Sequence, residues 1–408
     1  MNAPLPAEAA APQRLPVLRL KRGQERRLNA GHLWVYSNEV DSAATPLSDF
    51  RPGQFVVVSR FDGKPLGTAY VNPHALICAR LVSRRPGAVL DEGRLHQRFT
   101  EALALREALY AEPYYRLVYS EGDQLPGLVV DRYGDHLVVQ LNTAGMEARR
   151  EQVLDALETL LTPRGIVLRN DSPMRALEGL EREVAVARGQ VPETLTVREN
   201  GLTFTIDPLH GQKTGWFYDH RDNRARLRRY LGEGDRVLDV FAYVGAWSLN
   251  AAAAGASEAL AVDSSAPALE RLAANAEANG LAERITPRRG DAFSELKALR
   301  EAGERFDVVI LDPPALVKRK KDLDEGARAY LELNRLAMQV LRPGGFLVSA
   351  SCSFHFTDEL LRRTLLRAAR RLGRPLALLE RGGLGPDHPV HPAIPETDYL
   401  ACFFCRVG

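Results

Sequence analysis

The sequence predicts a protein of three parts: a small β-barrel over residues 14–80, an α+β unit over 81–195, and a doubly wound α/β domain over 196–408. Three observations lead to this prediction. With 408 residues, the chain is too long for one core of ordinary size. Its first part is patterned as short strands with Gly and Pro between them, and its last part alternates strands with helices.

The composition indicates a soluble globular protein of a reducing compartment, and we expect it in the cytoplasm. Hydrophobic residues make up 45% and charged residues 26%, and four cysteines are too few for a disulfide framework in this length. A net charge of +2 does not by itself indicate a polyanionic partner. There is no apolar run of membrane-spanning length and no secretion signal, and residues 1–13 are interpreted as a disordered Ala/Pro tail.

The first part contains strand-like runs at 55–58, 66–70 and 76–80, separated by the turn pairs Asp62-Gly63 and Asn72-Pro73. Its leading segment is basic and is followed by Trp34 and Tyr36; the basic residues are Arg14, Arg19, Lys21, Arg22, Arg26 and Arg27. Cations that hold phosphates beside aromatic rings that stack on bases are typical of an RNA-binding module. A solvated charged face with aromatic residues in the core explains this segment equally well.

The middle part reads as a helix near 95–109, a hairpin around 133–135, a helix near 147–161 and a strand at 166–169. Asp171, Arg175 and Glu178 follow this strand without an obvious chemical pattern. Structural ion pairing is therefore favoured for them over a functional role.

The last part begins with a hairpin closed by Asn200-Gly201, the preferred pair for a type I′ turn. The polar and aromatic segment 211–224 that follows is predicted to be a ligand-facing loop. Alternating elements then predict a mostly parallel sheet with helices on both faces, its last strand, near 399–406, closing the edge. The other strands are expected near 236–240, 258–262, 285–289, 306–311 and 345–350, and the helices near 246–254, 266–278, 293–301 and 324–340.

Acidic residues mark the ends of successive predicted strands, where ligands of such sheets bind. They are Asp239, Asp263, Asp291 and Asp312. Asp239 lies within an apolar strand, where an ion would have to be desolvated unless something uses it. The loop before Gly245 lacks the G-x-G-x-x-G and Walker patterns of phosphate binding. A nucleoside-like ligand without phosphates is therefore expected, and S-adenosylmethionine fits because its amino group and hydroxyls can donate to acids.

The last part resembles the class I S-adenosylmethionine-dependent methyltransferases in DVFAYVGAWS, Asp263, GDAF and LDPPALVK. Four further segments extend the likeness to nearly the whole chain: LKRGQERRLNAGHLWVYSNEV, SEGDQLPGLVVDRYGD, GQKTGWFYDHRDNR and SASCSFH. Together they are similar to the RlmI-type 23S rRNA cytosine-C5 methyltransferases. This resemblance implies an N-terminal PUA domain, a small middle domain and a C-terminal catalytic domain.

The resemblance also implies a cofactor site made by these strand ends and the loop before them. In this sequence the methionine side of the cofactor would meet Asp239, Phe241, Tyr243 and Gly245, the ribose Asp263, and the adenine Asp291 and Ala292. Asp312 and Pro313 would lie between the cofactor and the target base. The loop 213–221 would cover the pocket, with Phe217, Asp219 and Arg221 as contacts.

Cys352 is the expected nucleophile, because C5 of cytosine becomes electron-rich only after a thiolate adds at C6. Asp312 would hydrogen-bond the base and stabilise the adduct. A buried, inert Cys352 is the competing interpretation. The base that removes the C5 proton stays unassigned, and His355, nearby in sequence, is not favoured. Cys402 and Cys405 are interpreted as core residues of the last strand rather than metal ligands, so no metal site is expected.

Two other functions remain open. The first is methylation of an amino group, adenine N6 or guanine N2, although Ala315 stands where such enzymes usually carry an aromatic residue. The second is a non-catalytic RNA-binding assembly factor. The four cations 318–321 predict a basic rim that contacts RNA, expected to be 23S rRNA, and neither DNA nor a membrane is an expected partner. The oligomeric state is left open, with a homodimer as one option.

Overall fold

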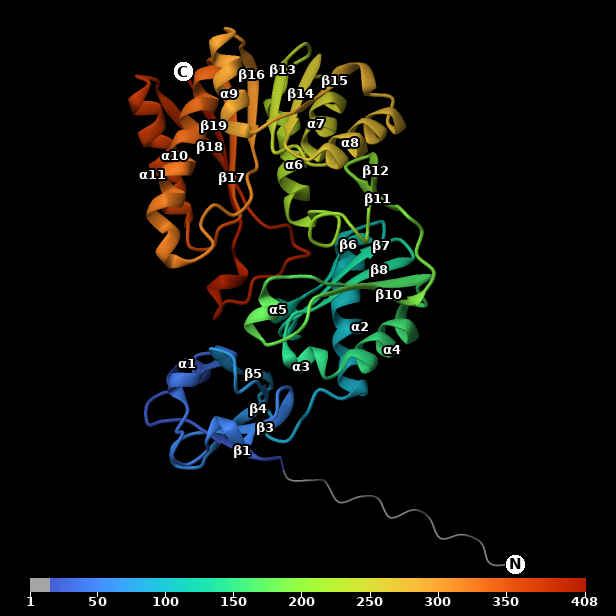
Figure 1. Cartoon of the computed structure of the whole chain (residues 1–408), viewed down its shortest axis with the longest axis vertical. Helices are drawn as coiled ribbons and strands as arrows, with labels where there is room; N and C mark the ends of the chain where they lie inside the picture. The colour runs from blue at the N-terminus through green and yellow to red at the C-terminus, as the bar shows by residue number, and fades with distance from the viewer. Residues whose placement is uncertain (1–14) are drawn as a thin grey trace, which may run out of the picture.

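The computed structural model describes residues 15–408, so the predicted tail and Arg14 lie outside the described residues. The N-terminal part is a five-stranded sheet in the order β1-β3-β4-β5-β2 (Figure 1). Its strands are β1 Val17–Arg19, β2 Trp34–Tyr36, β3 Gln54–Ser59, β4 Pro65–Val71 and β5 Ile77–Ser83, with the short helix α1 Arg26–Asn29. Alternate residues of these strands, such as Val56 and Val58, form its core.

The middle part is a second five-stranded sheet in the order β10-β9-β8-β7-β6, covered by α2 and α4. The predicted hairpin and helices are confirmed, with small differences at their ends. The elements are α2 Glu92–Leu109, β6 Tyr114–Tyr119, β7 Leu128–Tyr133, β8 His136–Leu141, α3 Ala144–Glu147, α4 Arg150–Leu161, β9 Gly165–Asn170, α5 Met174–Leu177 and β10 Glu183–Gly189.

A separate hairpin, β11 Leu195–Glu199 and β12 Leu202–Ile206, leads into the last part. Asn200 and Gly201 have φ values of 53° and 81°. Positive φ at both central residues is what a type I′ turn requires, which confirms the prediction for this pair.

The last part contains a seven-stranded sheet in the order β15-β14-β13-β16-β17-β19-β18, in which β13 to β17 are parallel. The strands are β13 Arg236–Val240, β14 Glu258–Asp263, β15 Ile285–Arg289, β16 Phe306–Leu311, β17 Leu341–Ser351, β18 Leu376–Gly382 and β19 Ala401–Val407. The helices are α6 Arg221–Leu227, α7 Ala246–Ala253, α8 Ala266–Ala278, α9 Ala292–Glu301, α10 Leu323–Val340 and α11 Asp358–Arg371. The predicted strands and helices are confirmed, and α7 and α8 cover one face while α9, α10 and α11 cover the other.

One prediction about this sheet is wrong. The last strand, β19, does not close the edge, because β18 pairs with it on the outside. β19 is apolar on both faces and buried, as an internal strand should be. β18 is mostly exposed although it begins with the apolar run 376–379, and so short a run without alternation does not by itself distinguish a strand from a helix.

The carboxyl ends of β13 to β17 point toward the middle sheet, and the segment 383–400 runs down between the two (Figure 1). Its contacts with the middle part are specific: the Arg106 guanidinium donates to the carbonyl of Asp387, and the Tyr119 hydroxyl to that of Thr397. Part of the middle unit therefore borders the carboxyl edge of the large sheet.

Buried ion pairs join the N-terminal and middle parts. Arg80 of β5 pairs with Glu178 at 2.7 Å, and Asn72 donates to the same carboxylate. Asp171 and Arg175 are paired too, with Arg169 and Glu147 respectively. The prediction of structural pairing for this group is confirmed.

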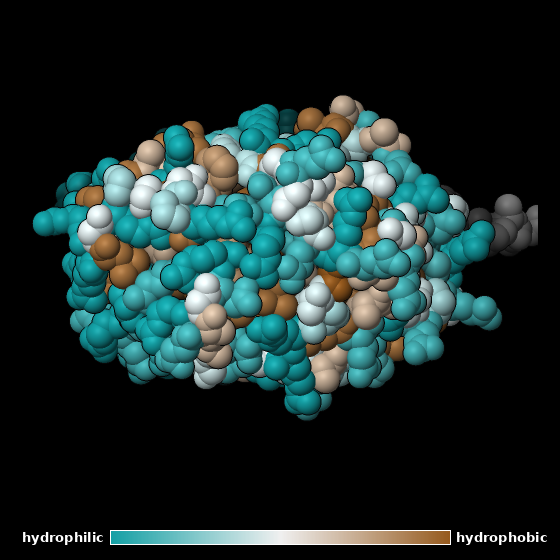
Figure 2. Space-filling view, turned by 90° about the horizontal axis from the view of Figure 1, so that it is seen from above, coloured by the Kyte–Doolittle hydropathy of each residue, from teal (hydrophilic) through white to brown (hydrophobic). Residues whose placement is uncertain are grey.

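The molecular surface is mostly hydrophilic where Figure 2 shows it, and its hydrophobic residues are scattered among polar ones. Within residues 15–408, no helix is both long enough and apolar enough to cross a membrane.

Candidate active site

The turn between β13 and α7 has an unusual backbone. Phe241, Tyr243 and Gly245 all have positive φ, at 71°, 49° and 87°. Such values strain residues that carry side chains and concentrate at functional sites. At Gly245 a Cβ atom would lie 2.7 Å from Leu272, so only glycine fits. The turn is also tied to the next strand, because the backbone N–H of Tyr243 donates to Asp263 at 2.9 Å.

Asp239 lies fully buried at the start of this turn. Its Oδ2 accepts hydrogen bonds from the backbone N–H and hydroxyl of Ser248, whereas its Oδ1 is buried without a partner. Burial raises the pKa of Asp239 to about 7. The hydrogen bonds from Ser248 lower this pKa, and the nearby charge of Asp312 raises it further. A buried carboxylate oxygen without a donor is costly, so this atom suits a ligand that brings a donor or a positive charge.

Asp312 follows β16 and is held by two donors. Its Oδ1 lies 3.2 Å from Nε2 of His220, and its Oδ2 accepts from the indole N–H of Trp247 at 3.0 Å. Burial acts against its charge, but His220 and Trp247 together lower the pKa of Asp312. The carboxylate is thus ionised and fixed in orientation at neutral pH.

Cys352 lies just beyond the end of β17, beside Asp312. Because β16 and β17 are parallel neighbours, their ends are adjacent, and the thiol lies 3.8 Å from the carbonyl oxygen of Pro313. Cys352 is partly exposed, whereas the other three cysteines are buried. Burial raises the pKa of its thiol to about 11; Lys213 acts in the opposite direction, and Asp312 and Asp219 add to the rise. The resting thiol is therefore protonated.

The serines on either side of Cys352 are held by hydrogen bonds within the protein. Ser351 and Ser353 both hydrogen-bond the hydroxyl of Tyr330, whose ring stacks on Phe356 at 4.3 Å. They fix the end of the strand and thereby the position of the thiol.

The predicted ligand-facing loop meets the β13–α7 turn. The ring of Phe217 packs edge to face on Tyr243 at 5.5 Å, and Lys213 Nζ lies 4.6 Å from the centre of the Phe217 ring. Asp219 is buried; its Oδ2 accepts from Tyr399 at 2.6 Å, and its Oδ1 has no partner. Burial disfavours its charge, but Lys213 and His220 lower the pKa of Asp219. The loop thus adds a second buried acid with an unused oxygen.

Arg221, Asp291 and Ala292 make contacts within the chain. Arg221 donates to the carbonyl of Tyr114, and its guanidinium lies 4.3 Å from the Tyr110 ring, so it joins the loop to the middle part. Asp291 is exposed and caps α9 by accepting from the backbone N–H of Ser294, and Ala292 is buried beneath this cap. Asp291 and Ala292 start α9 beyond the strand β15.

Four residues of this cluster were not predicted from the sequence: His220, Trp247, Tyr330 and Tyr399. His220 and Trp247 lie inside the marked segments 211–224 and DVFAYVGAWS, so their closeness in sequence to Asp219 and Gly245 is the signal for them. No sequence pattern marks Tyr330 or Tyr399. Only the fold brings Tyr330 to the serines beside Cys352 and Tyr399 to Asp219. Cys402 and Cys405 are buried in β19, and no group of metal-ligating side chains occurs within residues 15–408.

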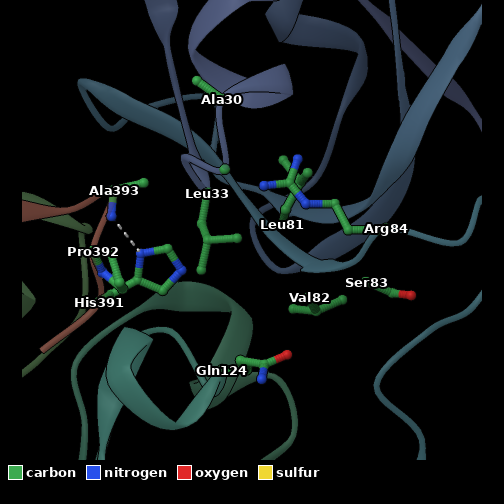
Figure 3. A pocket seen from close by; sticks show the side chains of 11 residues that line it. Ala30, Leu33, Leu81, Val82, Ser83, Arg84, Gln124, His391, Pro392 and Ala393 are labelled. Atoms are coloured by element: carbon green, nitrogen blue, oxygen red, sulfur yellow. Dashed lines mark hydrogen bonds between the residues drawn. The ribbon is translucent and has the colours of Figure 1, made fainter. Parts of the chain in front are cut away.

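A separate cavity of about 330 Å³ lies where the three parts of the chain meet (Figure 3). Leu33, Leu81 and Arg84 line it from the N-terminal part, Gln124 from the middle part and His391 from the last. His391 accepts from the N–H of Ala393, and Arg84 donates to the carbonyls of Leu28 and His32. None of the predicted site residues reaches this cavity, so it is distinct from the cluster around Cys352.

Comparison with known proteins identifies the family. Residues 18–84 match a PUA-like domain, and residues 179–397 match the S-adenosylmethionine-dependent methyltransferases. Ribosomal RNA large subunit methyltransferase I of Vibrio cholerae is 36% identical over 400 residues, which cover 96% of this chain and 99% of that protein. The chain belongs to this family. Its Escherichia coli member is also 36% identical, over 95% of this chain and 98% of its own length.

Solved structures agree on the fold. A SAM-dependent methyltransferase candidate from Streptococcus mutans superposes with a TM-score of 0.81 at 22% identity, covering 96% of this chain and all of that one. A methyltransferase candidate in complex with SAH gives a TM-score of 0.83 with the same identity and coverage. The family confirms the predicted methyl donor, S-adenosylmethionine, and the predicted combination of a PUA-like domain with a Rossmann-like catalytic domain. The unused oxygens of Asp239 and Asp219 fit the ammonium and hydroxyl groups of this cofactor.

Proposed function

We propose that the protein methylates C5 of a cytosine in 23S rRNA through a covalent bond between Cys352 and C6. The observation that carries this proposal is the position of the Cys352 thiol beside Asp312-Pro313, at the edge where the cofactor carboxylates gather. The rRNA substrate is inferred from the relatives, whose names describe large-subunit rRNA methyltransferases. In the cell the enzyme would meet this substrate in the cytoplasm.

The cofactor would lie along the strand ends. Asp239, with its unused Oδ1, would accept from the ammonium group, and the β13–α7 turn at Phe241, Tyr243 and Gly245 would shape the methionine side. Asp263 would bind the ribose hydroxyls. When bound, S-adenosylmethionine supplies an electrophilic methyl group.

The remaining proposed contacts lie at the adenine end of the site and in the loop 213–221. Asp291 and Ala292 would lie at the adenine, and Phe217 and Asp219 would close the pocket from the loop. Arg221, expected as a direct contact, is proposed instead to position that loop, since its guanidinium meets Tyr114, Tyr110 and Glu199.

Cys352 and Asp312 would have different roles in the reaction. Cys352 gives its proton to solvent water and its sulfur adds to C6 of cytosine, while N3 takes up a proton from water; the addition breaks the C5–C6 double bond and makes C5 nucleophilic. Ionised Asp312 accepts from the N4 amino group and from N3 once that atom carries a proton, and so stabilises the adduct. After C5 has taken the methyl group it loses its proton, the double bond re-forms and the Cys352 thiolate leaves.

The target nucleotide must leave its stack to reach Cys352. A cavity of about 380 Å³ begins at Ser353, the residue after Cys352, and is lined further by Phe354 and Tyr399, but neither Cys352 nor Asp312 lines it. The four cations 318–321 are exposed nearby, after Asp312, and would hold the RNA backbone. We further propose that 14–80 binds RNA, that 81–195 supports the site and that 196–408 catalyses the reaction.

Mass spectrometry of nucleosides from 23S rRNA methylated in vitro tests the proposal. The expected product is 5-methylcytidine, and Cys352→Ala should form none. RNA that carries 5-fluorocytidine should become covalently attached to the wild-type enzyme and not to Cys352→Ala. A methylated adenine or guanine, or full activity of Cys352→Ala, would rule the mechanism out.

A further inference from the structure

The helix α11 presents a face of arginines to solvent. Arg363, Leu366, Arg367, Arg370 and Arg371 line one shallow groove of about 440 Å³. Their spacing of three, one, three and one residues places them on one side of the helix, while Leu361, Leu365 and Ala368 on the other side are buried against the sheet. The groove is therefore a feature of the outer surface of the catalytic domain.

Positive charge is concentrated here although the whole chain is nearly neutral. Residues 358–374 contain six arginines and two acidic residues, whereas the net charge of all 408 residues is +2. A cluster of this kind creates a local field that attracts an anionic partner.

Half of these six arginines have no partner for their guanidinium group within the described residues. Glu359 pairs with Arg362 and Arg363, and Arg374 donates to backbone carbonyls such as that of Leu341. Within residues 15–408, Arg367, Arg370 and Arg371 form no ion pair and no side-chain hydrogen bond. A solvated face that only keeps a protein soluble would carry both signs of charge, as α10 does with Glu332 and Arg335.

The position of α11 connects this face with the active site. The helix begins at Asp358, six residues after Cys352, at the carboxyl edge of the sheet. Its 14 residues extend about 20 Å away from that edge. An RNA whose target base lies at Cys352 can therefore continue along α11.

We propose that Arg363, Arg367, Arg370 and Arg371 form a second RNA-binding surface that holds backbone phosphates of the substrate outside the catalytic pocket. Arginine suits this role, because its planar guanidinium binds phosphate oxygens in pairs. RNA is favoured over an acidic protein because the same domain takes an RNA substrate. The inference therefore rests on the proposed function.

The test compares two double variants of the full-length enzyme with the wild type. Arg367→Gln/Arg371→Gln alters the groove, and Arg182→Gln/Arg305→Gln removes the same charge from two other exposed arginines. Binding to transcribed 23S rRNA is measured by filter retention at several KCl concentrations. The groove variant should bind about tenfold more weakly than the control, and its slope of log K against log salt should be smaller by between about 1 and 2.

Activity separates the possible outcomes. At saturating rRNA the groove variant should keep its kcat while its KM for rRNA rises. Equal RNA affinity and salt slope in both variants would overturn the proposal, and would leave an acidic protein as the occupant. If the wild type itself neither binds nor methylates 23S rRNA, the proposed function is wrong. This result differs from failure of the groove proposal, in which the wild type is active and the two variants bind equally.

Discussion

The thiol sulfur of Cys352 lies 3.8 Å from the carbonyl oxygen of Pro313, so this thiol and the carboxylate of Asp312 lie at the ends of neighbouring parallel strands. This arrangement has an electrostatic consequence. An ionised carboxylate beside a thiol opposes formation of the thiolate, and Asp312 contributes to the raised pKa of Cys352. Asp312, proposed to hold the base, thus adds to the effect of burial in keeping the Cys352 thiol protonated.

Replacing Asp312 by Asn should therefore make Cys352 more reactive toward simple alkylating agents while it abolishes methyl transfer. The wild-type rate of iodoacetamide labelling should rise with pH toward about pH 11, because only the thiolate reacts. In Asp312→Asn the curve should move to lower pH, with labelling about threefold to tenfold faster at pH 8. Mass spectrometry of the peptide that contains Cys352 measures the labelling. The other three cysteines are buried, so we expect them to react more slowly. Slower labelling in Asp312→Asn would contradict this account.

The pKa of Asp239 predicts a second effect, on stability. In the unfolded chain this carboxyl titrates near pH 4, but in the folded protein near 7, so the folded state binds the extra proton between these values. The raised pKa stabilises the folded state below pH 4, and this stabilisation is lost as the pH rises to 7. The loss in the free energy of unfolding is roughly 4 kcal/mol at most, because the pKa differs by about three units between the two states.

Asp239→Asn should therefore gain stability relative to the wild type as the pH rises from 5 to 8, and should lose affinity for SAH. Thermal unfolding across this range measures the first effect and calorimetric titration with SAH the second. Parallel pH profiles for the two proteins would show that the carboxyl is not protonated when folded.

The catalytic sheet was predictable because its signals are local. The apolar run around Asp239 and the residue Gly245 mark a strand, a turn and a helix within 14 residues. β18 was missed because it is exposed and carries no alternation. The hydrophobic pattern of the sequence located the strand ends that carry the acidic residues of the site. It could not locate the residues from distant segments that hydrogen-bond to them. Tyr399 meets Asp219 across 180 residues, and no periodicity encodes such a contact.

The buried pair Arg80–Glu178 should hold the N-terminal sheet to the middle part. Without Glu178, the buried Arg80 keeps only the longer contact with Glu121 at 3.8 Å, so Glu178→Gln should cost about 3 kcal/mol. We expect a lower unfolding temperature and faster proteolysis of the N-terminal part. Asp62→Asn, which breaks the solvent-exposed pair with Arg60 in the turn between β3 and β4, is the control and should change stability by less than about 1 kcal/mol. Equal effects of the two changes would contradict the assigned role.

Lys213 should act on Cys352 in the direction opposite to Asp312. Its ammonium group packs on Phe217 and favours the thiolate, so it keeps the pKa of Cys352 from rising further. Lys213→Met should therefore slow iodoacetamide labelling of Cys352 at pH 8, in enzyme free of RNA and cofactor. Lys213→Arg, which keeps the charge, should restore much of the rate.

Lys320→Met supplies the control for this experiment, because Lys320 is exposed in the basic segment 318–321. It removes the same charge by the same substitution, and should weaken RNA binding but leave the labelling rate of Cys352 unchanged. The measurement thus separates a lysine that acts on the nucleophile from one that acts on RNA. Equal labelling rates in Lys213→Met and Lys320→Met would mean that Lys213 does not influence the thiol.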